Sequence, residues 1–150
     1  MHMETSYLVG KTIKGVLTYP LQEVHPAWKS ELTPAICTYM AFFELADGEF
    51  IGVAPCEVDL DGERYPILGL SLECCERSSM PLAQPSGNVV DVVALTEAEL
   101  VLPLKVCRVV ESDPLGEGAV SQFRIEGEAS CAIVLRHIMP PITLGIVVEN

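Results

Sequence analysis

AICTYMAFFELADGEFIGVA, residues 35 to 54, predicts two strands joined by a tight turn. Residues 36–45 are rich in β-branched and aromatic types, and both alternating faces are largely apolar. This is typical of a strand covered on both faces, with a buried helix as the alternative. Asp47-Gly48 favours the strand, because both residue types tolerate the positive φ of a hairpin turn. We therefore predict a hairpin whose return strand, residues 49–53, ends at Pro55.

The rest of the chain predicts more strands, at residues 7–19, 63–75, 104–111, 119–126, 131–138 and 142–149. Thr96 and Glu99 have the spacing of a helix-capping box, and Pro103 limits that helix to a short turn. A second helical turn is predicted at residues 26–32, which begin with proline. Prolines, a glycine and serines in ERSSMPLAQPSGN, residues 76–88, are typical of a linker.

These elements predict a mainly β protein. We expect antiparallel sheets in two adjoining lobes, sandwich- or barrel-like, with one or two short helical turns. The predicted division is an N-terminal β lobe over residues 1–80, a linker over 81–88 and a C-terminal β lobe over 89–150. A single domain is the alternative, because 150 residues fit one domain.

The charge of the chain bears on its partners. Nine basic and twenty-one acidic residues give a net charge of −12. This disfavours nucleic acid and anionic membranes, and favours a basic protein as partner. Solubility alone is the alternative explanation of the charge. No apolar run reaches the ~18 residues of a membrane-spanning helix, and no secretory signal is visible. We therefore expect a cytoplasmic protein with its six cysteines reduced, and leave its oligomeric state open.

One acidic cluster, EVDLDGE at residues 57–63, approaches a calcium-binding loop. Glu57, Asp59, Asp61 and Gly62 fit places 1, 3, 5 and 6 of an EF-hand loop, but place 12 falls on Leu68 instead of a bidentate carboxylate. Both flanks also predict strands, so an EF-hand is rejected. A weaker cation site and a contact for a basic partner remain alternatives to a solvated acidic turn.

Motifs for catalysis are absent from the sequence. There is no Cys-x-x-Cys pair and no nucleophile, zinc-protease or nucleotide-binding fingerprint. The thiols of Cys74 and Cys75 would point to opposite faces of a strand, so they would not share a metal. We predict no cofactor, metal or catalytic residue. A small-ligand-binding protein or small enzyme, with a site between the lobes near His25, Cys37 and His137, is the alternative.

The first hypothesis is an acidic binding protein that inhibits a basic partner. The acidic run from Glu44 to Glu63 would supply charge, and Trp28 or Tyr65 an aromatic anchor. The predicted partner-binding residues are Trp28, Glu44, Asp47, Glu49, Glu57, Asp59, Asp61, Glu63 and Tyr65. A further alternative is an accessory subunit of a larger assembly, which buries the apolar strands near either end of the chain.

Two short motifs carry a family resemblance, and they lie in the first third of the chain. Leu8-x-Gly10-Lys11-x-Ile13-x-x-Val16, followed by Phe43-x-Leu45-x-Asp47-Gly48-Glu49, resembles small acidic bacterial proteins encoded beside polymorphic toxins as immunity proteins. The resemblance implies a cytoplasmic, non-catalytic inhibitor that blocks a toxin domain. No binding residue carries over, because these families share no fixed interface motif.

Overall fold

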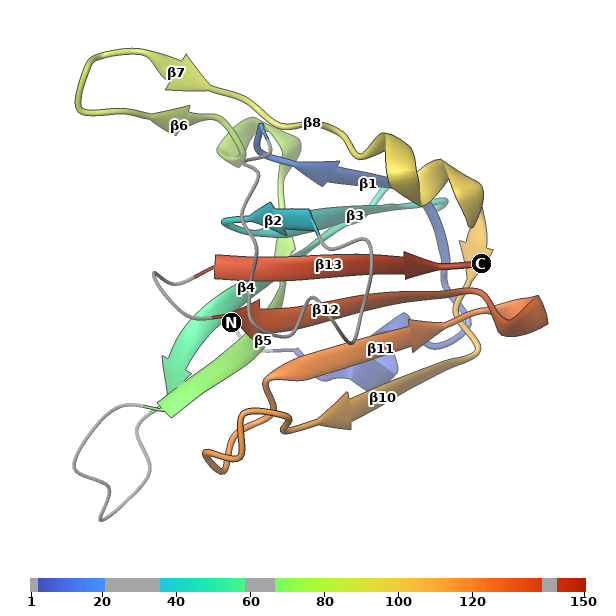
Figure 1. Ribbon diagram of the computed structural model, residues 1–150. Helices are drawn as coiled ribbons and strands as arrows, with labels where there is room; N and C mark the ends of the chain where they lie inside the picture. Colours follow the sequence, from blue (N-terminus) through green and yellow to red (C-terminus); the bar gives the residue numbers. More distant parts are fainter. Residues whose placement is uncertain (1–2, 21–35, 59–66, 139–142) are drawn as a thin grey trace.

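The computed structural model describes residues 3–20, 36–58, 67–138 and 143–150, and within them the protein is mainly β, as predicted (Figure 1). One antiparallel sheet has the order β5-β4-β3-β1-β8, with β9 also paired to β1, and a second has the order β10-β11-β12-β13-β2. The strands of the first sheet are β1 (Thr12–Thr18), β3 (Ala41–Leu45), β4 (Phe50–Val58), β5 (Ile67–Cys75), β8 (Val93–Ala94) and β9 (Leu104–Lys105). Those of the second are β2 (Ile36–Thr38), β10 (Arg108–Ser112), β11 (Gln122–Glu126), β12 (Ala132–Ile138) and β13 (Thr143–Glu149).

Short elements complete the described chain. A separate hairpin pairs β6 (Leu82–Ala83) with β7 (Val89–Val90). The 3-10 turns are η1 (Thr5–Leu8), η3 (Arg77–Ser79), η4 (Thr96–Leu100) and η5 (Glu128–Ser130). The helical turn predicted from Thr96 is therefore confirmed, but its capping box is wrong, because Leu95 is the N-cap and no side chain caps the turn. No helix among the described residues is long and apolar enough to cross a membrane.

The predicted hairpin is present. β3 and β4 pair from Ala41–Val53 to Glu44–Phe50, and Gly48 has φ +95° in the turn between them. The Asp47 carboxylate accepts a hydrogen bond from the Glu49 N–H at 2.9 Å, which supports the turn locally. Phe42 and Phe43, on opposite faces of β3, are 3% and 0% exposed. The prediction of a strand covered on both faces is thus confirmed.

Two boundaries of this hairpin were predicted wrongly. The single strand expected over residues 36–45 is two strands in different sheets, because β2 pairs with β13 and β3 pairs with β1. The return strand does not end at Pro55 but continues to Val58. Pro55 is tolerated because the pairing with β3 stops at Val53, and because the opposite residue, Leu70, donates its N–H to Val120 instead.

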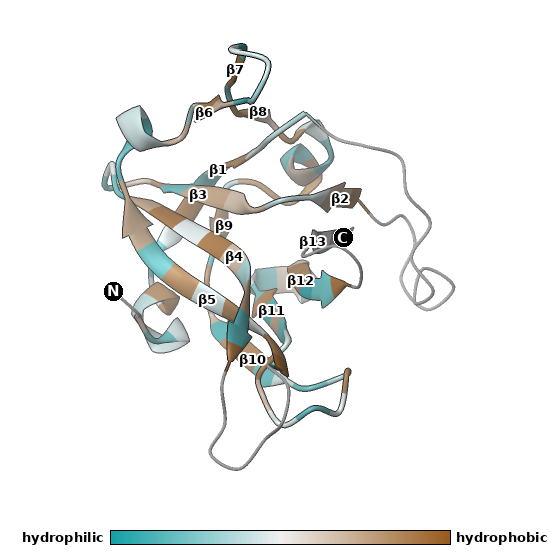
Figure 2. Ribbon diagram, turned by 90° about the vertical axis from the view of Figure 1, so that its left-hand side faces the viewer, coloured by the Kyte–Doolittle hydropathy of each residue, from teal (hydrophilic) through white to brown (hydrophobic). Residues whose placement is uncertain are grey.

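Each sheet takes strands from both sides of the predicted 81–88 boundary. β2 joins the C-terminal strands, while β8 and β9 join β1 of the N-terminal part. One core cluster lies between the sheets and draws on both of them, and Figure 2 shows hydrophobic positions recurring along β4 and β5. Its members include Leu8, Phe43, Leu45, Ile51, Leu72, Ile125, Ile133, Leu135 and Ile146. Burial of each such side chain contributes about 1.5–3 kcal/mol.

The segment predicted as a linker, residues 81–88, is exposed along its whole length but has regular structure of its own. It contains β6 and the turn into β7, where the Gln84 N–H donates to the Asn88 carbonyl at 2.8 Å. Met80, just before it, is fully buried, and its carbonyl accepts from the Tyr19 hydroxyl at 2.7 Å. Met80 and Tyr19 belong to a second, smaller apolar cluster with Phe42.

The first predicted strand begins later than expected, because residues 3–9 form a separate strap, named so from here on. The strap lies beside β5 near the N label of Figure 2 and contains η1. The Met3 N–H donates to the Leu72 carbonyl of β5 at 3.1 Å, and the Thr5 hydroxyl donates to Glu111 of β10 at 3.2 Å. Leu8 is fully buried in the main core. The strap therefore bridges edge strands of the two sheets.

Candidate functional site

The nine predicted binding residues do not form one described patch. Trp28, Asp59, Asp61, Glu63 and Tyr65, together with His25, lie outside the described residues. Glu44, Asp47 and Glu49 belong to the β3–β4 hairpin, and Glu57 lies near the far end of β4. At ~3.3 Å per residue, Glu49 and Glu57 are roughly 26 Å apart along the strand. The four described carboxylates therefore form two separate groups.

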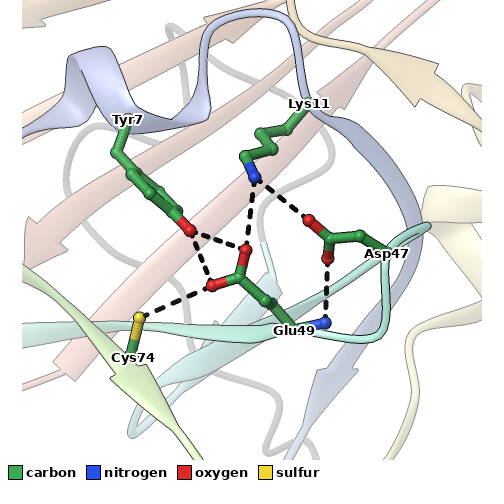
Figure 3. A network of polar contacts seen from close by, with 5 residues as sticks. All are labelled: Tyr7, Lys11, Asp47, Glu49 and Cys74. Carbon is green, nitrogen blue, oxygen red and sulfur yellow. Dashed lines mark hydrogen bonds and ion pairs between the residues drawn. The ribbon is translucent and has the colours of Figure 1, made fainter.

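The first group belongs to a polar network around Glu49 (Figure 3). The Glu49 carboxylate accepts the Tyr7 hydroxyl at 2.6 Å and the Lys11 ammonium at 3.2 Å, and it lies 3.9 Å from the Cys74 sulfur. Lys11 also contacts Asp47 at 3.0 Å, and its ammonium lies 4.8 Å from the centre of the Tyr7 ring. The network links the strap and β1 to the hairpin turn. Its Tyr7–Glu49 bond joins residues that are 42 positions apart in the sequence.

The charges of this network are partly compensated, because one lysine ammonium contacts two carboxylates. The Asp47 and Glu49 carboxylates raise the pKa of Lys11 above its ordinary value. The Glu49 N–H, followed by the Lys11 ammonium, lowers the pKa of the Asp47 carboxyl. Glu44 likewise lies 3.7 Å from the Lys14 ammonium. Carboxylates that already have lysine partners attract an incoming basic protein less than free ones do.

The second group lies at the opposite end of the sandwich. We name it the acidic end: Glu57, Asp113 and Glu117. Glu117 accepts the Leu68 N–H on β5 at 3.1 Å, and Leu68 pairs directly with Glu57 of β4. Glu57 and Glu117 are both exposed. The loop between β10 and β11 thus carries acidic side chains to the end of β4 and β5.

Asp113 holds the shape of that loop. Its carboxylate accepts the N–H groups of Gly118 at 2.8 Å and Gly116 at 3.0 Å, and the Ser121 hydroxyl at 3.3 Å. These donors, Gly118 first, lower the pKa of the Asp113 carboxyl, so it is charged at neutral pH. Sequence reasoning missed both Asp113 and Glu117. The available signal was Asp-Pro-x-Gly, which is typical of a turn stabilised by its own aspartate.

Cys37 and His137, predicted for a ligand or catalytic site, face opposite sides of the second sheet. His137 pairs with Leu144 of β13, and Cys37 pairs with the next residue of that strand, Gly145. Paired residues point to the same face of a sheet, and successive residues of a strand point to opposite faces. His137 is 1% exposed, and its Nδ1 lies 2.8 Å from the Gly69 carbonyl, an arrangement that requires the proton on Nδ1. Within the described chain its Nε2 has no hydrogen-bond partner.

Metal ligation has no support in the part of the chain that the structure describes, where no three His, Cys, Asp or Glu side chains are grouped to hold an ion. Cys74 lies beside Glu49, while Cys75 packs against the cluster of Tyr19 and Phe42. The two thiols are therefore separated as predicted.

Exposed apolar side chains form a third feature. Several large ones come from the segment that runs along β6, β7, β8 and η4 at the top of Figure 1. They are Leu82 (41% exposed), Val89 (65%), Val93 (49%) and Leu100 (69%).

No protein-family model, curated protein or solved structure matches this chain. The functional argument therefore depends on geometry and charge.

Proposed function

We propose that this protein is a non-catalytic acidic binding protein that blocks a basic partner protein, in the manner of an immunity protein or other inhibitor. The supporting observation is how its few basic side chains are used. Seven of the nine lie in the described chain, all but Lys29 and Arg64. At least five of the seven are in ion pairs with carboxylates: Lys11, Lys14, Arg77, Arg108 and Arg124.

This pairing affects how the surface attracts a partner. Internal ion pairs cancel charge locally, so the excess of carboxylates determines the long-range field. A negative field accelerates association with a basic protein, and this acceleration falls with salt because exposed charges are screened beyond ~10 Å at 0.1 M.

The acidic end is our proposed contact surface. Asp113 holds the loop through its backbone N–H contacts, and Glu117 is fixed to Leu68. Carboxylates that are already positioned lose less conformational freedom when they bind. They suit lysine or arginine side chains, whose charge-assisted hydrogen bonds are about twice as strong as neutral ones.

The experiment begins with capture of a partner from the source cell's lysate at low and high salt. Association rates of the recovered partner are then measured for Glu57→Lys with Glu117→Lys. The matched control is Glu97→Lys with Glu99→Lys on η4, which changes the net charge by the same amount. We expect the acidic-end variant to associate at least ~10-fold more slowly at low salt, and the control to be affected much less.

Equal slowing in both variants would mean that net charge alone, and not the acidic end, governs association. If neither variant is slowed, or if the captured partner is acidic, the proposed function is rejected. Thermal melting of each variant verifies that it is folded, since Glu117 also accepts a backbone N–H.

A second candidate, an accessory subunit, is favoured by the exposed aliphatic side chains along residues 82–100. Val89→Lys with Leu100→Lys should then abolish a stable complex that survives high salt, as measured by sedimentation. An inhibitor bound through the acidic end should keep its partner in this variant.

A further inference from the structure

The strap is held to the body by Leu8, by Met3, which packs partly buried against the main core, and by a few polar contacts. Of its seven residues, all of them described, Leu8 is the buried one. Met3 makes the backbone contact with Leu72, while the Thr5 and Tyr7 hydroxyls bind Glu111 and Glu49. Hydroxyl contacts at exposed positions exchange readily with water, so Leu8 carries most of the attachment.

The strap meets β1 at Gly10 and Lys11. Gly10 has φ +87°, and a Cβ placed there would have open space around it. The Gly10 N–H donates to the Val106 carbonyl at 2.9 Å, and the Val106 N–H returns a bond to Lys11 at 2.9 Å. The chain is therefore anchored to Val106 at Gly10 and Lys11, and the Lys11 N–H also donates to the Leu8 carbonyl at 3.0 Å. The pairing of β1 does not depend on residues 3–9.

Beneath the strap lies an edge able to accept another strand. Leu72 directs its carbonyl outward from β5 to Met3, and in a strand the backbone groups of Cys74 point the same way. This edge is flanked by two carboxylates, Glu49 and Glu111, which the strap contacts through neutral hydroxyls. The strap itself carries Glu4 and no basic residue. The strap therefore supplies no cation to Glu111, and Glu49 has only Lys11, which it shares with Asp47.

We infer that the strap is displaceable and that an extended basic segment of the partner takes its place on the Leu72–Cys74 edge of β5. The inference rests on the proposed function, because it takes the partner to be basic. The incoming segment adds a strand to the sheet, as in β-augmentation, and its backbone replaces Met3 at Leu72. Its lysine or arginine side chains pair with Glu111 and add to Lys11 at Glu49, two carboxylates that the strap's hydroxyls cannot neutralise.

The test uses a fluorescent octapeptide of alternating lysine and valine, with a glutamate–valine octapeptide as the charge control. Binding is measured by anisotropy at low salt. Leu8→Ala removes the anchor, and Val9→Ala, at an exposed position of the same strap, is its matched control. Because apparent affinity scales with the population of the released state, we expect Leu8→Ala to bind the basic peptide at least ~10-fold more tightly than the parent and Val9→Ala.

A second variant protects the test against misfolding of Leu8→Ala. Tyr7→Phe with Thr5→Val removes both hydroxyl contacts and leaves the core unchanged, and we expect it to tighten binding by roughly threefold. If the folded variants bind the basic peptide no more tightly than the parent, or bind the acidic peptide equally well, the inference is overturned.

The outcomes separate this inference from the proposed function. If a basic partner is captured and depends on the acidic end, while the strap variants leave peptide binding unchanged, the function stands and the strap inference fails. If the strap variants tighten peptide binding but low-salt capture yields no basic partner, the acceptor edge stands and the proposed function fails.

Discussion

Gly127→Ala tests how the turn before η5 packs against the first sheet. A Cβ at Gly127 would lie 2.8 Å from Cγ, 3.2 Å from Cδ2 and 3.3 Å from Cδ1 of Leu104. Gly127 has φ −107° and ψ −164°, an extended conformation that alanine also adopts. Any loss of stability in Gly127→Ala therefore comes from packing and not from backbone strain.

The magnitude follows from how little Leu104 can move. It is 2% exposed and pairs with Ile13 of β1, so its side chain has no route to solvent. Overpacking typically destabilises the fold by about 1–3 kcal/mol. Alanine also reduces the conformational freedom of the unfolded chain relative to glycine, which offsets about 0.4–1 kcal/mol of that loss. We expect a net loss of about 1–2 kcal/mol, or roughly 2–8 °C in Tm for a chain of this size.

The assay is urea unfolding followed by circular dichroism, arranged as a double-mutant cycle. Leu104→Ala alone should cost about 2–5 kcal/mol through its cavity. The double variant should be less destabilised than the sum of the two by about 1–3 kcal/mol, because the new methyl enters the vacated space. Glu128→Ala, at the exposed neighbouring position, is the control. Additive effects, or Gly127→Ala as stable as the parent, would refute this packing argument.

Three further predictions concern single side chains. In His137→Asn the amide nitrogen can replace Nδ1, so this variant should keep the bond to the Gly69 carbonyl. His137→Gln should lose the bond, and its free energy of unfolding, measured with urea, should fall by about 1–3 kcal/mol. Equal losses of stability in the two variants would contradict the assigned bond. The folded-state pKa of Asp113 is lowered, so its carboxylate stabilises the fold above its unfolded pKa of ~3.9, and that contribution is lost as pH falls through the folded value. Asp113→Asn should therefore have a lower urea midpoint than the parent at pH 7, with the gap closing below pH ~3.9; a gap that persists in acid would exclude this cause. Ala129 has φ +58°, so Ala129→Gly should raise the free energy of unfolding by about 0.5–1 kcal/mol, and a lower Tm would show that the methyl group packs favourably.

The elements of the fold were largely predictable from local sequence. Alternating apolar positions predicted most of the longer strands, and Asp47-Gly48 predicted the turn between β3 and β4, because side-chain period and positive φ depend on neighbouring residues only. The break between β2 and β3 was not predictable. Both pieces are apolar on each face, so the pattern continues unbroken through Tyr39, although the chain passes from one sheet to the other there.

The candidate site was less predictable than the fold, because charge along the chain does not reveal which charges are paired. Glu49 and Glu57 belong to one acidic run, yet Glu49 is bound by Lys11 and Tyr7 while Glu57 is exposed beside Glu117. These contacts join residues far apart in sequence. No local pattern encodes them.

By itself, the sequence determined a mainly β chain with an excess of negative charge and a defined central hairpin. Tertiary structure alone decided that β2 joins the C-terminal strands, that the strap bridges the two sheets, and that the acidic end brings the loop between β10 and β11 to strands β4 and β5 of the other sheet. The physical reason is the range of the interactions. Strand formation and turns depend on residues a few positions apart, whereas strand pairing and ion pairs depend on how the whole core closes.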